Sequence, residues 1–121
     1  MELPVVNHPD YVAKINDDNK FPIKKFSALA DHLIKEGVVK KFYIPQECST
    51  ETMKSSHSLE YINHIRNKTL DIKLQKKIGF PINDSVVRRS FVATGGTVLA
   101  SKLALDSKLA CNTAGGSHHA T

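Results

Sequence analysis

The sequence contains no tryptophan and only two cysteines, Cys48 and Cys111. Neither cysteine belongs to a Cys-x-x-Cys pair, which excludes a zinc knuckle or a dithiol redox site built on that motif. Cysteines this sparse are typical of reduced thiols in a cytosolic protein, and we predict that both are free.

Long apolar runs are also missing. No stretch of the 121 residues approaches the roughly 18 apolar residues that a membrane-spanning helix needs. The first residues lack the basic and apolar regions of a signal peptide. We therefore expect a cytoplasmic protein with no membrane partner. The length fits one domain or part of one, and 40% hydrophobic with 24% charged residues suits a folded chain.

The net charge of +5 does not arise from one basic cluster. The densest basic pairs are each flanked by apolar residues, which is typical of the solvated faces of several elements. These pairs are Lys24-Lys25, Lys40-Lys41, Lys76-Lys77 and Arg88-Arg89. Aromatic residues make up 7%, and no nucleic-acid motif is present. We do not expect nucleic acid as a partner, and a basic nucleic-acid-binding domain is the lowest-ranked hypothesis.

Short apolar runs predict buried strands, and helical spacing or capping residues between them predict helices. The predicted strands are residues 3–6, 42–44 and 109–112. The predicted helices are residues 25–36, a stretch from a cap at Ser49 or Thr50 through Ile65, a loop or short helix over 70–78, and a long helix from a cap at Asn83, Asp84 or Ser85 through Leu105. The polar residues 11–20 predict a loop, and Pro22 is placed where a helix could begin.

Gly95 and Gly96 interrupt the longest predicted helix. Each glycine in a helix interior costs about 1 kcal/mol relative to alanine. Two explanations for the pair are open: a close backbone contact that excludes a side chain, or a break in the helix.

The order strand, helix, strand, several helices, strand predicts an α/β layered fold with a mainly parallel sheet. Parallel sheets are normally covered on both faces, so three short strands alone make an incomplete one. Ligands of open α/β sheets bind beyond the carboxyl ends of the strands. Because the last predicted strand arrives near Thr121, this sequence is expected to stop where a site should begin.

A glycine-rich loop with two histidines follows that strand, as Gly115-Gly116-Ser117-His118-His119. Glycines let the backbone approach a cavity closely, and two adjacent imidazoles can be tuned to different protonation states. A neutral imidazole can take a proton from water, and a charged one can stabilise an oxyanion. The same dipeptide could be a tag remnant or a solvent-exposed end.

The segment AGGSHHA, residues 114–120, resembles the glycine-glycine-x-histidine-histidine-alanine signature of the histone deacetylase family. Four further segments resemble that family in the same order along the chain. They are LPVVNHPDY (3–11), its first strand and loop; FPIKKF (21–26), its entrance loop in short bacterial and class IV-like members; SSHSLEYINHI (55–65), where such proteins carry a histidine, then an acidic residue and tyrosine; and ATGGTVLASKLAL (93–105), its long helix.

The resemblance implies a three-layer α/β/α fold of the arginase and deacetylase type, of which residues 1–121 would be the N-terminal portion of one catalytic domain. His118 matches the histidine assigned to electrostatic stabilisation. His119 matches the general base that later serves as general acid to the leaving amine. Gly115 and Gly116 match the glycines that shape the active-site loop. Phe21 and Pro22 match the substrate entrance.

The family holds zinc through an Asp-x-His pair on the next strand and a further aspartate, and a downstream tyrosine helps to hold the oxyanion. None of these is present in this sequence. The remaining histidines are scattered, and we expect no metal site among them. They are His8, His32, His57 and His64. We therefore expect zinc in the complete family domain and none bound by this chain alone, which would be inactive.

Three hypotheses follow. The first is a segment of a zinc-dependent deacetylase that acts on acyl-lysine proteins or small acylated amines, with a possible complementing C-terminal half. The second is a non-catalytic remnant or interaction module from a split or truncated gene. The third, ranked well below, is the nucleic-acid-binding domain, which salt-dependent binding would reveal.

Overall fold

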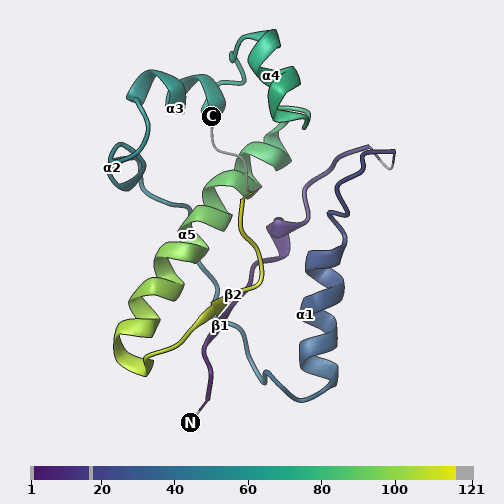
Figure 1. The fold of residues 1–121 in the computed structure, drawn as a ribbon, viewed down its shortest axis with the longest axis vertical. Helices are drawn as coiled ribbons and strands as arrows, with labels where there is room; N and C mark the ends of the chain where they lie inside the picture. The colour runs from purple at the N-terminus through teal and green to yellow at the C-terminus, as the bar shows by residue number, and fades with distance from the viewer. Residues whose placement is uncertain (1, 17, 117–121) are drawn as a thin grey trace.

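The computed structural model describes residues 2–16 and 18–116 of the chain (Figure 1). Within these residues, short strands and a 3-10 turn alternate with helices of very different length. The elements are β1 (Val5–Val6), η1 (Pro9–Tyr11), α1 (Lys25–Lys35), α2 (Thr50–Met53), α3 (Leu59–Arg66), α4 (Ile72–Ile78), α5 (Asp84–Ser107) and β2 (Cys111–Asn112). The strands predicted over residues 3–6 and 109–112 are confirmed but shorter than predicted, whereas the segment 42–44 forms an isolated bridge at Tyr43 and no strand.

A small parallel sheet joins the two ends of the described chain. β1 pairs in parallel with β2, with Val5 opposite Cys111 and Val6 opposite Asn112. On the opposite edge of β1, Tyr43 forms an isolated parallel bridge to Val6. All three predicted strand segments therefore meet, with β1 in the middle, and the prediction of parallel pairing is confirmed for them.

Helix α5 is the longest element and crosses the molecule diagonally in Figure 1. Asn83 caps its start, because the side chain accepts a hydrogen bond from the backbone N–H of Val86 at 2.9 Å. The helix continues through Gly95 and Gly96 without a break. A Cβ atom at Gly95 would lie 1.9 Å from the Gln46 carbonyl oxygen. A close backbone contact, not a break in the helix, therefore explains Gly95.

Two apolar clusters pack η1, α1, α2 and α3 against α5. Tyr11, Ile23, Phe26, Val92, Ala93 and Ala114 form the first cluster. Cys48, Met53, Ile62 and Phe91 form the second. Because Phe91, Val92 and Ala93 are consecutive, the two clusters lie on different sides of the same turn of α5. Both cysteines are free, as predicted: Cys48 is buried in the second cluster and Cys111 is exposed.

One detail of the predicted helices is wrong. The stretch from Ser49 through Ile65 is not continuous, because α2 ends at Met53 and α3 begins at Leu59. Ser58 accepts a hydrogen bond from the backbone N–H of Tyr61 at 3.2 Å, and this side-chain cap starts a new helix. α1 begins at Lys25, three residues after Pro22, and then follows the prediction closely.

The polar loop predicted for residues 11–20 is wrong at its first residue. Tyr11 closes the 3-10 turn η1, and its side chain is fully buried, with 0% exposed. Of the helices formed by the described residues, none combines the length and the apolar character required to cross a bilayer.

Candidate functional site

An open cavity of about 770 Å³ lies between α3, α4 and the N-terminal half of α5. Its walls are mostly apolar: Ile62 comes from α3, Leu74 from α4 and Phe91 from α5. Such a hollow with a few polar groups at its margin is the usual form of a small-molecule site.

Several predicted site residues meet at this cavity. Gly115 and Gly116, which follow β2, form part of its lining, and so does Phe21 from the segment before α1. Pro22 is exposed next to Phe21. His118 and His119 lie outside the residues that the structure describes. The structure thus places the predicted active-site loop and part of the predicted entrance at one cavity, although they are more than 90 residues apart in sequence.

Aromatic contacts fix the position of Phe21. Its ring meets the Phe80 ring edge-on, with centroids 5.2 Å apart, and lies 6.0 Å from the Phe26 ring. The Lys25 ammonium lies over both Phe21 and Phe26, at 5.0 and 5.1 Å from the ring centroids. Aromatic faces attract cations, so these ring contacts and the Lys25 ammonium help to hold the Phe21 segment in place.

Arg89 contributes a positive charge to the cavity wall, as Lys77 does. Its Nε donates to the Tyr11 carbonyl oxygen at 2.7 Å, and its Nη2 donates to the Gly115 carbonyl oxygen at 3.4 Å. The guanidinium also lies over the Phe26 ring, 4.7 Å from its centroid. Partial burial lowers the pKa of Arg89 from its usual value, but arginine stays charged at neutral pH.

Tyr11 connects η1 to the strand that leads into the glycine loop. Its hydroxyl donates to Asn112 Oδ1 at 2.7 Å, and Asn112 Nδ2 donates to the Ala93 carbonyl oxygen of α5 at 3.3 Å. Burial raises the pKa of Tyr11 to about 12, against the opposing effects of Asn112 and Arg89. Gly96 makes room for this contact, since a Cβ there would lie 2.1 Å from the Tyr11 hydroxyl oxygen.

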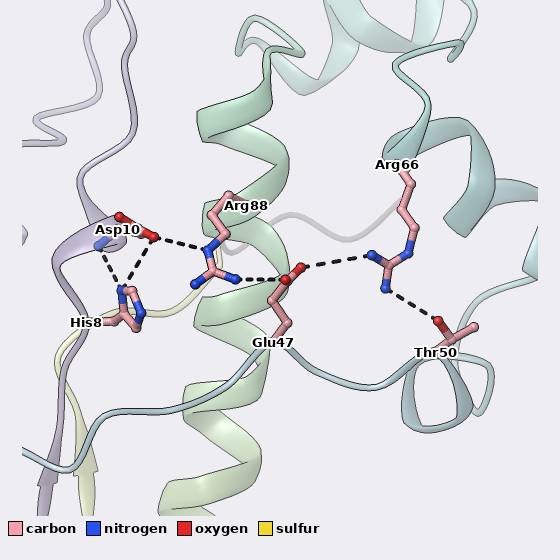
Figure 2. Close-up of polar contacts among 6 residues, drawn as sticks. All are labelled: His8, Asp10, Glu47, Thr50, Arg66 and Arg88. Atoms are coloured by element: carbon pink, nitrogen blue, oxygen red, sulfur yellow. Dashed lines mark hydrogen bonds and ion pairs between the residues drawn. The ribbon is translucent and has the colours of Figure 1, made fainter.

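Arg88, the neighbour of Arg89, belongs to a different group of contacts (Figure 2). Its Nε lies 3.0 Å from Asp10 Oδ2 and its Nη1 lies 2.7 Å from Glu47 Oε2. Glu47 also faces Arg66, which donates to Thr50 Oγ1 at 3.4 Å. The group links η1, α5, the segment before α2, and α3 at the surface. Exposed pairs of this kind contribute little energy each, so they orient elements more than they stabilise them.

These contacts account for one of the basic pairs in the sequence. Arg88 faces two carboxylates and Arg89 faces two backbone carbonyls. The interpretation of this pair as a simple solvated face is therefore wrong for Arg89, which is partly buried in the cavity wall, whereas Arg88 lies at the surface. Two guanidinium groups engaged in this way are poorly placed to bind phosphates, which argues further against a nucleic-acid surface at this point.

The other described histidines do not gather at one point. His57 lines the cavity and lies against the Tyr61 ring at 5.4 Å. His64 Nδ1 is 2.8 Å from Thr69 Oγ1, and His8 Nδ1 accepts from the Asp10 N–H at 2.9 Å. In residues 2–16 and 18–116, no three side chains of histidine, cysteine, aspartate or glutamate are grouped to hold a metal ion. These residues alone therefore do not fit a zinc site, which needs about three protein ligands.

Sequence reasoning missed Tyr11 and Arg89 as site residues. A lone tyrosine in a polar stretch has no periodic partner, so no pattern marks it as buried. Arg88 and Arg89 are adjacent residues of the same type. Their side chains have different surroundings only because each residue of a helix is rotated by about 100° from the one before. The apolar residues that flank the pair were the available signal, because an arginine beside Val87 and Phe91 lies near a core.

Comparison with known proteins shows what the chain is similar to. The family model described as "Histone deacetylase domain" matches residues 19–121. An uncharacterized protein of Picosynechococcus sp. is 43% identical over 122 residues, which cover 99% of this chain and 41% of that protein. The chain therefore spans about two-fifths of the length of this curated relative.

Proposed function

This chain belongs to the histone deacetylase family, and from that premise we propose that it forms the N-terminal part of a zinc-dependent deacetylase. The substrates would be acetyl or other acyl amides of lysine in proteins, or of a small amine. One observation supports the proposal most: the Gly115-Gly116 loop and the Phe21 segment, which resemble the family's active-site loop and entrance, line the same cavity.

The proposed domain covers residues 1–121 and more. In the complete three-layer α/β/α fold, further strands would extend the parallel sheet beyond β2. The described residues do not fit zinc by themselves, so its ligands would come from elsewhere in the domain, either later in the same polypeptide or in a complementing chain.

The proposed chemistry of this segment is proton transfer. His119, as a neutral imidazole, would accept a proton from the attacking water. It would then return that proton to the leaving amine as the carbon–nitrogen bond breaks. His118, as the charged partner, would stabilise the negative charge that develops on the acyl oxygen. Positioned groups of this kind contribute about 10²–10⁴-fold each to the rate.

The first experiment is to read the coding sequence past Thr121 and to compare it with the intact mass of the native polypeptide. A frame that continues into an Asp-x-His strand and a later aspartate supports the deacetylase. If neither this frame nor a neighbouring one supplies those ligands, the catalytic proposal fails. The second hypothesis, a non-catalytic remnant or interaction module, would then replace it.

Hydrolysis of an acetyl-lysine peptide and of an acetylated diamine by the zinc-loaded native polypeptide tests the reaction itself. His119→Ala is expected to lower kcat by at least about 10³-fold. His32→Ala is the matched control, because His32 is exposed on α1 and does not line the cavity. Equal activity of the two variants would contradict the role of His119.

A further inference from the structure

Arg89 occupies an unusual place for a charged side chain. It is partly buried in the cavity wall, and among the ion pairs of the described residues it has no carboxylate partner. Its contacts are the Tyr11 carbonyl, the Gly115 carbonyl and the Phe26 ring. Partial burial of a charge without a counter-charge is unfavourable, so a stability role alone does not explain an arginine here.

The glycine loop has few other contacts that could fix its course. Gly115 and Gly116 are exposed, and a Cβ atom at either position would meet nothing within 4 Å. The buried Ala114 anchors the residue before them. Beyond Ala114, the hydrogen bond from Arg89 to the Gly115 carbonyl is the side-chain hydrogen bond that the described residues give this loop.

The geometry points to Arg89 as a positioning residue for the proposed catalytic loop. Its guanidinium holds the Gly115 carbonyl at a fixed place relative to η1 and α1, and in the sequence Gly115 comes shortly before His118 and His119. This inference rests on the proposed function.

The physical reason lies in the shape of the side chain. A guanidinium is a rigid planar fork, so its Nε bond to Tyr11 fixes where its Nη2 points. The Phe26 ring holds the plane of the fork. Tyr11 itself is fully buried and bonded to Asn112, which makes it a firm reference point. Lysine has a single ammonium on a flexible stem, and it cannot hold both carbonyls in one geometry.

Arg88 provides a matched control. It is the same residue type, one position earlier on α5, and it is likewise held by two acceptors. Those acceptors are Asp10 and Glu47 at the surface, and Arg88 does not line the cavity. Arg88→Lys and Arg89→Lys therefore remove similar contacts, but only the second touches the glycine loop.

The first measurement needs no activity. Hydrogen–deuterium exchange of the zinc-loaded native polypeptide is followed in peptides that contain Thr113 and Ala114, whose backbone N–H groups donate to Val6 and Asn112. Exchange of these two amides is expected to be about tenfold faster in Arg89→Lys, as for the loss of one hydrogen bond to a charged group. Arg88→Lys should exchange like the wild type in these peptides. Unchanged exchange in Arg89→Lys would overturn the inference, whether or not the protein proves to be a deacetylase.

The second measurement is the kinetics of acetyl-lysine peptide hydrolysis. Arg89→Lys is expected to lower kcat by about 10²-fold with KM within about twofold, because a displaced catalytic group costs rate without costing binding. An effect on KM alone would overturn the inference. So would an equal loss of kcat in Arg88→Lys, if the loss in each variant matches the fall in its thermal unfolding midpoint.

If Arg89→Lys does not fold, Arg89→Gln, which keeps an N–H donor without the charge, takes its place with the same expected results. A wild type without turnover rejects the proposed function, and the exchange data then decide the role of Arg89 alone.

Discussion

Tyr11 connects the start of the chain to the strand before the glycine loop through a single hydroxyl group. The side chain is fully buried, and its hydroxyl bonds to Asn112, 101 residues away. A phenol in this position is stable only in its neutral form, because burial disfavours the phenolate. The raised pKa of Tyr11 therefore predicts that the free energy of unfolding changes with pH in the alkaline range.

The direction of that dependence follows from the two pKa values. The pKa of Tyr11 is about 12 in the folded protein, against an ordinary value of 10.0. Its contribution is complete below about pH 10, where both states are protonated, and it is lost as pH rises through 12. The difference between the pKa values corresponds to roughly 3 kcal/mol at most.

Urea unfolding of the native polypeptide and of Tyr11→Phe between pH 8 and 12 tests this prediction. At pH 8 the variant should be less stable by about 1–2 kcal/mol, the usual cost of one lost buried hydrogen bond. Above pH 10 the wild type should lose stability faster than the variant, so that the gap narrows. Because all other ionisable groups are shared, parallel pH profiles would contradict the buried phenol.

At the scale of elements, the packing of the segment before α2 against α5 depends on one missing side chain. The backbone N–H of Cys48 donates to the Phe91 carbonyl of α5 at 2.9 Å. The Gln46 carbonyl oxygen lies so close to Gly95 that an added Cβ would be 1.9 Å away. Since the obstructing atom belongs to the backbone, it cannot turn aside as a flexible side chain would.

Gly95→Ala tests this contact. In an open helix the change would stabilise by about 1 kcal/mol through helix propensity. Here we expect a net loss of about 2 kcal/mol, because overpacking against a fixed backbone costs up to about 3 kcal/mol. Thermal unfolding of the native polypeptide measures the difference. Gly116→Ala is the control for stability, since a Cβ there meets nothing within 4 Å; equal midpoints for the two variants would contradict the packing.

Sequence patterns predicted the elements better than their packing. The helix predicted over residues 25–36 is α1, because five apolar residues at helical spacing and a terminal glycine leave little choice. The break between α2 and α3 was missed, because Ser58 is one serine among several and only its geometry makes it a cap. Likewise, no periodicity distinguishes a helix break at Gly95 from a close contact with a segment nearly 50 residues earlier.

The candidate site was predictable only where a motif carried it. Gly115 and Gly116 stood out through the family signature, and Phe21 through a weaker resemblance. Arg89 carried no motif, because its role depends on which acceptors the fold brings near it. Arg88 and Arg89 contact different acceptors because they point to different sides of α5, and those sides are set by how the helix packs.

At the scale of the whole molecule, the described residues expose much apolar surface and leave their sheet small. Leu105 is 85% exposed, Leu109 71% and Ile72 63%. β2 pairs with β1 along one edge, and a parallel sheet is normally covered on both faces and extended by further strands. Uncovered apolar faces and free strand edges promote association.

We therefore predict that a polypeptide of residues 1–121 alone self-associates and binds the dye ANS several-fold more strongly than one that continues into the rest of a deacetylase domain. Further strands along β2 and helices over the sheet would remove this surface from water, and each 100 Å² of apolar area so buried stabilises by about 2.5 kcal/mol. The measurement is light scattering after size-exclusion chromatography together with dye fluorescence, with both polypeptides at equal concentration.

Leu109→Ser in the 121-residue form should reduce dye binding, because the Leu109 side chain is among the most exposed apolar groups next to β2. A monomeric 121-residue form with no more dye binding than the longer one would mean that this apolar surface has no partner in the rest of the domain.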